Sequence, residues 1–477
     1  MEIKVFRRDW SEKLKKDDNG AKKMEVKQSD SLEFLKNQKD YENDIIFADP
    51  PYALGSEVII RADGKVDYAK ANDFMNKWEM PTGDYWEKWF IEAQRTLKYG
   101  GYLLMYGMDR QLLLFKYYAS LAGFQEQQSI YWYYISNFPK ATDLSKMIDK
   151  NNGVEFEKGE FLSENLSMGG GNYTRVERKE PSTPLAKKYD GYKYSISPLK
   201  QTCETIMVFK KPNKTGSVLH DTLAMENGDD TITCSALDID GNRVGTEKIN
   251  IHDAPVGTFA GGEPNRGSDT ESYREVEGRY PAQTFVDSQV AEKLDLQSGV
   301  SKGNNSIGGG EGGIWTKGNS KQVSQGYDDI GGCSKILHKC DYELIDFDLF
   351  IYNPKVDSGE RSNGLYGIEE KQYSHDGRKK PIENPYQRND SVAQNNHPTL
   401  KPIDLNCKIL KLFKTPNEQR ICYPFAGSGS EIIGGLKANF QDWTACEINQ
   451  EYVDIANARI KHYKENEYVQ LDLFGGE

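Results

Sequence analysis

The stretch QRICYPFAGSGSEIIGG, residues 419–435, combines an apolar run, a glycine-rich turn and the start of a second apolar run. Ile421, Cys422 and Tyr423 predict a short buried strand, and the residues from Ser430 onward predict a helix. Glycines between a strand and a helix let a ligand approach the backbone closely and meet the first N–H groups of the helix. The stretch therefore predicts an α/β fold with a ligand site at this turn; a purely structural turn is the alternative.

Glu447 lies roughly 20 residues after this turn, at the end of the next predicted strand, residues 442–449. In a nucleotide-binding α/β fold, an acid at this place holds ribose hydroxyls. The turn lacks the GxGxxG spacing of dinucleotide sites and the GxxxxGK[ST] pattern of NTP sites, so neither is the expected ligand. Ser428 and Ser430 do not form a nucleophile elbow, because this turn does not match G-x-S-x-G.

Strands and helices alternate on both sides of a long middle region. Before it we expect strands near residues 24–28, 44–48, 102–107 and 129–135, and helices over 31–38, 83–101 and 110–124, the second helix ending at Gly100-Gly101. After it we expect helices over 403–413, 430–440 and 450–465, with strands between them. This alternation predicts a doubly wound, mostly parallel sheet.

The middle region is rich in Gly, Ser and Asn, as in residues 167–173 and 303–320, with short strand-like pieces at 204–211 and 346–353. We therefore expect one α/β domain split by a loop-rich insertion. Its parts are the N-terminal half, residues 1–135, the insertion, 136–390, the C-terminal half, 391–465, and a tail, 466–477.

Composition excludes several classes of protein. The 477 residues carry a formal net charge of −12, which argues against a general positive coat for nucleic acid, although a basic cleft remains compatible with it. No signal peptide and no membrane-spanning run of roughly 20 apolar residues are expected. The odd number of scattered cysteines, seven, favours a reducing cytoplasm.

A second motif lies in DIIFADPPYALG, residues 44–55, where a buried strand leads into Asp49-Pro50-Pro51-Tyr52. Two consecutive prolines fix the backbone and remove two N–H donors. A rigid turn with a capping Asp is the structural alternative. This structural alternative is weakened because the DPPY turn and the glycine-rich turn occur in one α/β domain.

Together, and in this order, the two motifs resemble the S-adenosylmethionine-dependent DNA amino-methyltransferases, which modify adenine N6 or cytosine N4. The order DPPY, long variable region, FAGSG is similar to the circularly permuted β class, in phage-type or bacterial members. NNHPTLKP, residues 395–402, and QSDSLEFL, residues 28–35, are similar to further segments of the family. The resemblance covers most of the chain and implies a Rossmann-like methyltransferase sheet.

The resemblance also implies site residues. The methyl-acceptor site is Asp49, Pro50, Pro51 and Tyr52. The S-adenosylmethionine site is Asp30, Ser31, Asp49, His397, Thr399, Lys401, Phe425, Ala426, Gly427, Ser428, Gly429, Glu447 and Ile448. An Asp at the first tetrad position favours adenine N6, with cytosine N4 as the alternative. A non-catalytic DNA- or cofactor-binding protein on the same fold is a more distant alternative, and the modification subunit of a restriction system is another.

The tetrad suits this chemistry. Two acceptors, the Asp49 carboxylate and the Pro50 carbonyl, would draw an exocyclic amine toward a nucleophilic geometry, and Tyr52 would stack on the base. The base must be flipped out of double-stranded DNA, at a cost of a few kcal/mol. The sulfonium is already activated, so no metal and no covalent nucleophile is required.

The resemblance implies that the insertion, residues 136–390, is the target-recognition region, and candidate DNA contacts lie in it. Lys140, Lys200, Lys355 and Arg361 are expected phosphate contacts, with solvated surface charges as the alternative. Cys333, His338 and Cys340 lack a fourth ligand at zinc spacing, so no metal site is expected. The protein is expected to act as a monomer or homodimer.

The tail contains Gln470, Leu471, Asp472, Leu473 and Phe474. This sequence resembles the short peptide by which bacterial replication proteins bind the sliding clamp, and short apolar-tipped peptides commonly bind grooves. The alternative is a tail that covers the core of its own domain.

Overall fold

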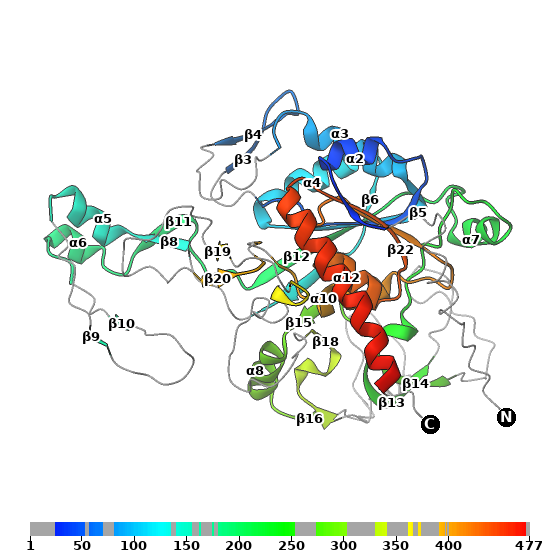
Figure 1. Ribbon diagram of the computed structural model, residues 1–477. Coiled ribbons are helices and arrows are strands. Elements are labelled where there is room, and N and C mark those ends of the chain that lie inside the picture. The colour runs from blue at the N-terminus through cyan, green and yellow to red at the C-terminus, as the bar shows by residue number, and fades with distance from the viewer. Residues whose placement is uncertain are drawn as a thin grey trace, which may run out of the picture.

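The computed structural model describes residues 24–52, 57–69, 81–134, 140–154, 162–163, 174–175, 180–252, 273–302, 330–340, 361–365, 371–373, 391–395, 397 and 400–473 (Figure 1). A large twisted sheet forms its centre. In order across the sheet, the strands are β1 (Val26–Gln28), β22 (Asp442–Glu447), β21 (Arg420–Tyr423), β2 (Asn43–Ala48), β5 (Leu97–Gly107), β12 (Cys203–Lys210), β7 (Ile130–Tyr133), β15 (Thr284–Val286) and β18 (His338–Lys339), with β6 (Gln125–Glu126) beside β12.

Neighbouring strands from β1 to β5 all run parallel. Strand β12 is antiparallel to both β5 and β7, and the parallel direction returns between β7, β15 and β18. The prediction of an α/β fold with a mostly parallel sheet is confirmed.

Helices cover both faces of this sheet. Side chains alternate along β2, so that Ile45 and Phe47 join one apolar core and Ile46 and Ala48 join the other. The first core includes α10 (Ile403–Leu412), α11 (Ser430–Lys437) and α12 (Gln450–Leu473); the second includes α2 (Ser31–Lys36), α3 (Tyr85–Thr96) and α4 (Asp109–Leu121). Each fully buried Leu, Ile or Phe contributes about 1.5–3 kcal/mol, so both faces stabilise the fold.

The two halves of the α/β domain are interleaved in the sheet. Strands β21 and β22 come from the C-terminal half, yet they lie between β1 and β2 of the N-terminal half. Ile45 of β2 pairs directly with Ile421 of β21. Strands far apart in the chain therefore bring the DPPY turn next to the glycine-rich turn.

The predicted end of the helix at Gly100-Gly101 is wrong. Helix α3 ends at Thr96, and β5 begins at Leu97. The register of β5 against β2 shifts between Leu97 and Tyr102, and Gly100 takes φ 78° within this irregularity. A Cβ on Gly100 would lie 2.7 Å from a main-chain oxygen, so the glycine serves a strand irregularity and a close backbone approach, not a helix end.

The assignment of all of residues 136–390 to an insertion also needs correction. The strand expected at 204–211 is β12, in the middle of the central sheet, and β15 and β18 extend that sheet. Antiparallel pairing with β5 along six residue pairs, Thr205 to Lys210, makes β12 part of the domain. The piece expected at 346–353 lies outside the described residues.

Smaller elements surround the sheet. A lobe formed by β8 (Lys140–Asp143), α5 (Leu144–Asn151), α6 (Pro184–Lys188) and β11 (Lys193–Ser197) projects from the body (Figure 1). The remaining elements are β3 (Glu57–Ile60), β4 (Val66–Ala69), β9 (Leu162–Ser163), β10 (Thr174–Arg175), α7 (Val218–Glu226), η2 (Asp240–Asn242), β13 (Val244–His252), β14 (Tyr273–Arg279), α8 (Ser288–Ser298), β16 (Ser301–Lys302), β17 (Ile330–Gly331), η3 (Cys333–Ile336), β19 (Lys371–Tyr373) and β20 (Ser391–Ala393). No helix in the described ranges has both the length and the apolar character needed to cross a membrane.

Candidate active site

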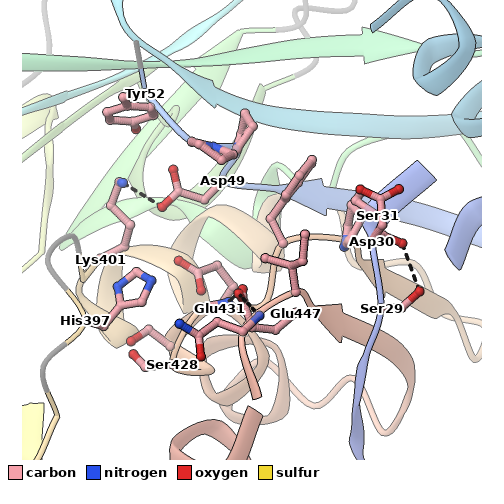
Figure 2. Close-up of a pocket in the computed structure, with 18 of the residues that line it drawn as sticks. Ser29, Asp30, Ser31, Asp49, Tyr52, His397, Lys401, Ser428, Glu431 and Glu447 are labelled. Atoms are coloured by element: carbon pink, nitrogen blue, oxygen red, sulfur yellow. Dashed lines mark hydrogen bonds and ion pairs between the residues drawn. The ribbon is translucent and has the colours of Figure 1, made fainter. Parts of the chain in front are cut away.

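A cavity of about 390 Å³ opens where four parallel strands end (Figure 2). Segments that follow β1, β2, β21 and β22 form most of its wall, because parallel strands place their carboxyl ends on one edge of a sheet. The lining residues are Ser29, Asp30, Ser31, Asp49, Pro50, Pro51, Tyr52, Pro81, Tyr85, His397, Leu400, Lys401, Pro424, Phe425, Gly427, Ser428, Ser430, Glu431, Glu447, Ile448 and Asn449.

Asp30 lies at one end of the cavity and caps helix α2. Its Oδ1 accepts hydrogen bonds from the main-chain N–H groups of Leu32 at 2.9 Å and Glu33 at 3.1 Å. Its Oδ2 accepts a third from the Tyr85 hydroxyl at 3.0 Å. Burial, and then the Asp30 charge, raise the pKa of Tyr85 well above its usual range, so this hydroxyl remains a donor.

The glycine-rich turn forms the floor. Gly427 and Gly429 adopt φ 49° and 86°, a region that favours glycine. The Gly427 N–H donates to Glu447 Oε2 at 3.0 Å, and the Asn449 N–H donates to Oε1 of the same carboxylate at 3.0 Å. A Cβ on Gly427 would lie only 3.0 Å from His397 Nε2. The turn therefore presents bare backbone to the cavity, and burial raises the pKa of Glu447 beside it.

The DPPY turn stands at the opposite end and is firmly held. Buried Gln111 on α4 donates through Nε2 to the Pro51 carbonyl at 2.9 Å, which adds to the rigidity of the prolines. The Tyr52 hydroxyl donates to Glu204 Oε2 at 3.3 Å. Burial raises the pKa of Tyr52, which keeps its ring neutral.

Lys401 and Asp49 form a buried ion pair at the centre of this end. Lys401 Nζ lies 2.7 Å from Asp49 Oδ2 and 3.4 Å from Glu204 Oε2, and its side chain is only 3% exposed. Within the described part of the chain, Asp49 Oδ1 is buried and has no hydrogen-bond partner. Burial raises the pKa of Asp49 and the Lys401 ammonium offsets part of that rise. Burial lowers the pKa of Lys401, but Asp49 and Glu204 outweigh it, so that pKa lies above its usual range and the ammonium stays charged.

Most residues expected at the site do gather at this cavity. Of the predicted cofactor residues, Ala426 and Gly429 shape the turn without lining the cavity, and Thr399 lies outside the described residues. The sequence did not reveal three further residues at the site. Tyr85 and Glu431 line the cavity, and Glu204 contacts Lys401 and Tyr52. Tyr85 and Glu431 stand in helices predicted only from periodicity, and Glu204 stands in a strand expected to belong to the insertion.

Arg361 is a correction. The sequence predicts a phosphate contact there, but Arg361 is only 8% exposed, and its NH1 donates to the main-chain oxygens of Asn395 at 3.1 Å and His397 at 2.7 Å. A buried guanidinium turned toward carbonyls cannot reach a DNA backbone. Arg361 instead fixes the segment that carries His397 into the cavity.

Three other lysines were expected to contact DNA phosphate. Lys200 is exposed, whereas Lys355 and the side chain of Lys140 lie outside the described residues. Within the described ranges, no group of three or more His, Cys, Asp or Glu side chains could hold a metal ion. The backbone of residues 470–473 continues helix α12, and Phe474 lies outside the described part.

Comparison with known proteins gives a family and several distant structures. The family described as DNA methylase, N6_N4_Mtase, matches residues 43–458. No curated protein matches the chain.

Three solved structures illustrate the structural similarity. M1.HpyAVI in complex with SAM is 12% identical, with 92% of this chain and 100% of that chain covered and a TM-score of 0.32. TTHA0409 from Thermus thermophilus, solved with S-adenosyl-L-methionine, is 10% identical, with 92% and 96% covered and a TM-score of 0.32. The cytosine-N4-specific PvuII DNA methyltransferase is 12% identical, with 96% and 98% covered and a TM-score of 0.36.

Proposed function

Because this chain belongs to the DNA methylase family of the N6-adenine and N4-cytosine type, we propose that it transfers a methyl group from S-adenosylmethionine to adenine N6 in double-stranded DNA. The observation that carries the proposal is the buried Asp49 Oδ1, which has no partner in the described part of the chain and lies at the cavity beside Pro50. A buried acceptor without a partner is costly, and a donor on a bound ligand would relieve that cost.

The cavity has features that suit this cofactor. Its volume of about 390 Å³ falls in the range of small-molecule sites. Gly427 leaves space that any Cβ would fill, and Glu447 lies where the fold places a ribose-binding acid. Asp30 and Ser31 would hold the adenine end, and the glycine-rich turn would hold the amino-acid end. When bound, S-adenosylmethionine supplies an activated methyl group.

Asp49 would act directly on the amine of the target base. Its Oδ1 and the Pro50 carbonyl would accept the two N–H groups, which directs the nitrogen lone pair away from the ring and toward the methyl group. Lys401 holds Oδ2 at 2.7 Å, so it orients the carboxylate while leaving Oδ1 available. Fixing both acceptors before the base arrives lowers the reorganisation needed in the transition state.

Tyr52 would stack on the flipped base. The Lys401 ammonium lies 4.9 Å from the centre of the Tyr52 ring, and Glu204 accepts the hydroxyl. The base would therefore use the ring face opposite the ammonium. Flipping costs a few kcal/mol, which stacking and the two accepted hydrogen bonds would offset.

Adenine is favoured over cytosine by Asp49 at the first position of the tetrad, a habit of the family. DNA incubated with the protein and methyl-labelled S-adenosylmethionine, digested to nucleosides and separated by mass, distinguishes the two bases. Labelled N6-methyladenine is the expected product. Labelled N4-methylcytosine in its place would overturn the assignment of the base while preserving the reaction type.

We also propose that residues 470–474 bind the replication sliding clamp and that Lys200 contacts DNA phosphate. A pull-down with the bacterial clamp should capture the full chain and lose it after deletion of 470–474. Equal capture of both forms would show that this peptide does not bind the clamp.

A further inference from the structure

The cavity carries more negative than positive charge. Among the described lining residues, carboxylates come from Asp30, Asp49, Glu431 and Glu447, and the single ammonium comes from Lys401. Asp30 is hydrogen-bonded by helix α2 and Tyr85, Glu447 by two main-chain N–H groups, and Asp49 by Lys401. The Glu431 carboxylate differs from these three, because no other residue in the described ranges forms a hydrogen bond or ion pair with it.

Glu431 lies in the first turn of α11 and is 6% exposed. Figure 2 shows it on the same side of the cavity as Asp49 and Lys401, with Asp30 and Ser31 at the far end. Titratable groups from five elements or segments face Glu431. They are Asp49 after β2, Lys401 before α10, Arg459 on α12, Tyr106 on β5 and Tyr423 on β21. His397 lines the same cavity.

The cations near Glu431 are already engaged. Lys401 is held by Asp49 and Glu204, and Arg459 NH1 donates to the Ser428 carbonyl at 2.7 Å and to the hydroxyls of Ser428 and Ser430 at 3.1 Å. Burial, followed by the charge of Asp49, raises the pKa of Glu431 to about 7. A further cation inside the cavity would therefore stabilise the ionised form of Glu431.

We propose that Glu431 distinguishes the positively charged methyl donor from its neutral product. Its carboxylate stabilises the sulfonium of S-adenosylmethionine, a positive charge that the thioether of S-adenosylhomocysteine lacks. This inference rests on the proposed function, because it assumes that the cavity takes this cofactor. It assigns to Glu431 a role in cofactor selectivity and in product release, separate from the role of Asp49 at the amine.

The sign of the pH dependence follows directly. A cation beside Glu431 favours the ionised carboxyl, so binding of S-adenosylmethionine near pH 7 releases protons from the fraction that is protonated. Affinity for S-adenosylmethionine rises as pH increases through about 7 and levels off above it. Affinity for S-adenosylhomocysteine lacks this rise. A unit charge 5–10 Å away at an effective dielectric constant of about 20 changes affinity by roughly fifteen- to a few hundredfold.

Isothermal titration calorimetry of the full chain tests the inference. Each compound is titrated at pH 7 in two buffers of different ionisation enthalpy, which gives the number of protons released. The wild type should release protons with S-adenosylmethionine and none with S-adenosylhomocysteine. Glu431→Gln should abolish this difference and lower the ratio of the two affinities by at least about tenfold, while Glu33→Gln, on the exposed side of α2, should match the wild type.

Retained binding of S-adenosylhomocysteine shows that the Gln variant is folded. Equal proton release for the two compounds, or a difference that persists in Glu431→Gln, would overturn the inference and move the titration to another group such as His397. Failure of the wild type to bind either compound would instead overturn the proposed function.

Discussion

The two ends of the cavity carry similar acids in different surroundings. Asp30 follows β1 and Asp49 follows β2, yet Asp30 accepts three hydrogen bonds, while Asp49 has Lys401 on one oxygen and no described partner on the other. The Asp30 carboxylate is fixed in position by hydrogen bonds from the N-terminus of its own helix and from Tyr85, which suits a residue that binds a ligand. The buried Oδ1 of Asp49 can still accept a hydrogen bond from a ligand that binds later. Under the proposed function, this difference separates the end that holds the cofactor, the binding end, from the end that acts on the base, the reacting end.

Loss of the Asp49 carboxylate should have the largest effect. Asp49→Ala removes an acceptor aligned with the developing charge on the amine, so kcat should fall about a hundred- to thousandfold or more. Cofactor affinity, measured by calorimetry, should change little. Retained turnover in this variant would contradict the assigned role of the reacting end.

Removal of Lys401 should destabilise the protein. Lys401→Met leaves Asp49 and Glu204 buried without their cation, which should lower the free energy of unfolding by about 3–5 kcal/mol. The pKa of Asp49 should rise further once the ammonium is gone. The free energy of unfolding should then fall as the pH rises through this raised pKa, because the folded protein holds the protonated form of Asp49. Residual activity, which needs the carboxylate, should move to higher pH.

Urea unfolding at several pH values measures this effect. Lys461→Met is a matched control, because Lys461 is 75% exposed, and its free energy of unfolding should change by about 0.5 kcal/mol or less. Equal stability of the two variants would show that the buried pair is not what organises the reacting end.

A side chain at Gly427 should block the binding end. Gly427→Val places a branched side chain at φ 49° and against His397, so cofactor affinity should fall by at least about tenfold. Gly123→Val is the control, since Gly123 also has a positive φ, 88°, but nothing lies within 4 Å of the position that its Cβ would take. Only the Gly427 variant should lose affinity in calorimetry; similar affinities would place the cofactor elsewhere.

The smallest effect should come from Tyr85. Tyr85→Phe removes one of the three hydrogen bonds to Asp30, which is worth about 0.5–1.5 kcal/mol. KM for the cofactor should rise severalfold with kcat unchanged, whereas Tyr117→Phe, at an exposed position of α4, should alter neither. A fall in kcat would mean that the two ends are not independent.

Local patterns in the sequence predicted much of the fold, and the family resemblance implied most of the residues at the cavity. The strand–turn–helix units at Asp30 and Gly427 follow from apolar runs, glycines and a helix-capping Asp, all of which act over a few residues. The order of the two motifs, together with the family resemblance, then indicated that their strands share one sheet.

Long-range contacts account for what the sequence could not predict. Lys401 reaches Asp49 across 352 residues of chain, and Glu204 joins them only because β12 lies in the central sheet. Arg361 was expected to contact DNA phosphate, or to be a solvated surface charge, because it lies in the predicted insertion. Its burial depends on carbonyls of a neighbouring segment, which no local pattern reveals.

The separation of binding and reacting ends is tested most directly by a crossed measurement on Asp30→Asn and Asp49→Asn. Cofactor Kd and the single-turnover rate of methyl transfer at saturating cofactor are measured for both variants. Asp30→Asn should weaken cofactor binding and retain the rate, while Asp49→Asn should retain the Kd and lose the rate. Loss of rate in Asp30→Asn, or an unchanged rate in Asp49→Asn, would contradict this separation.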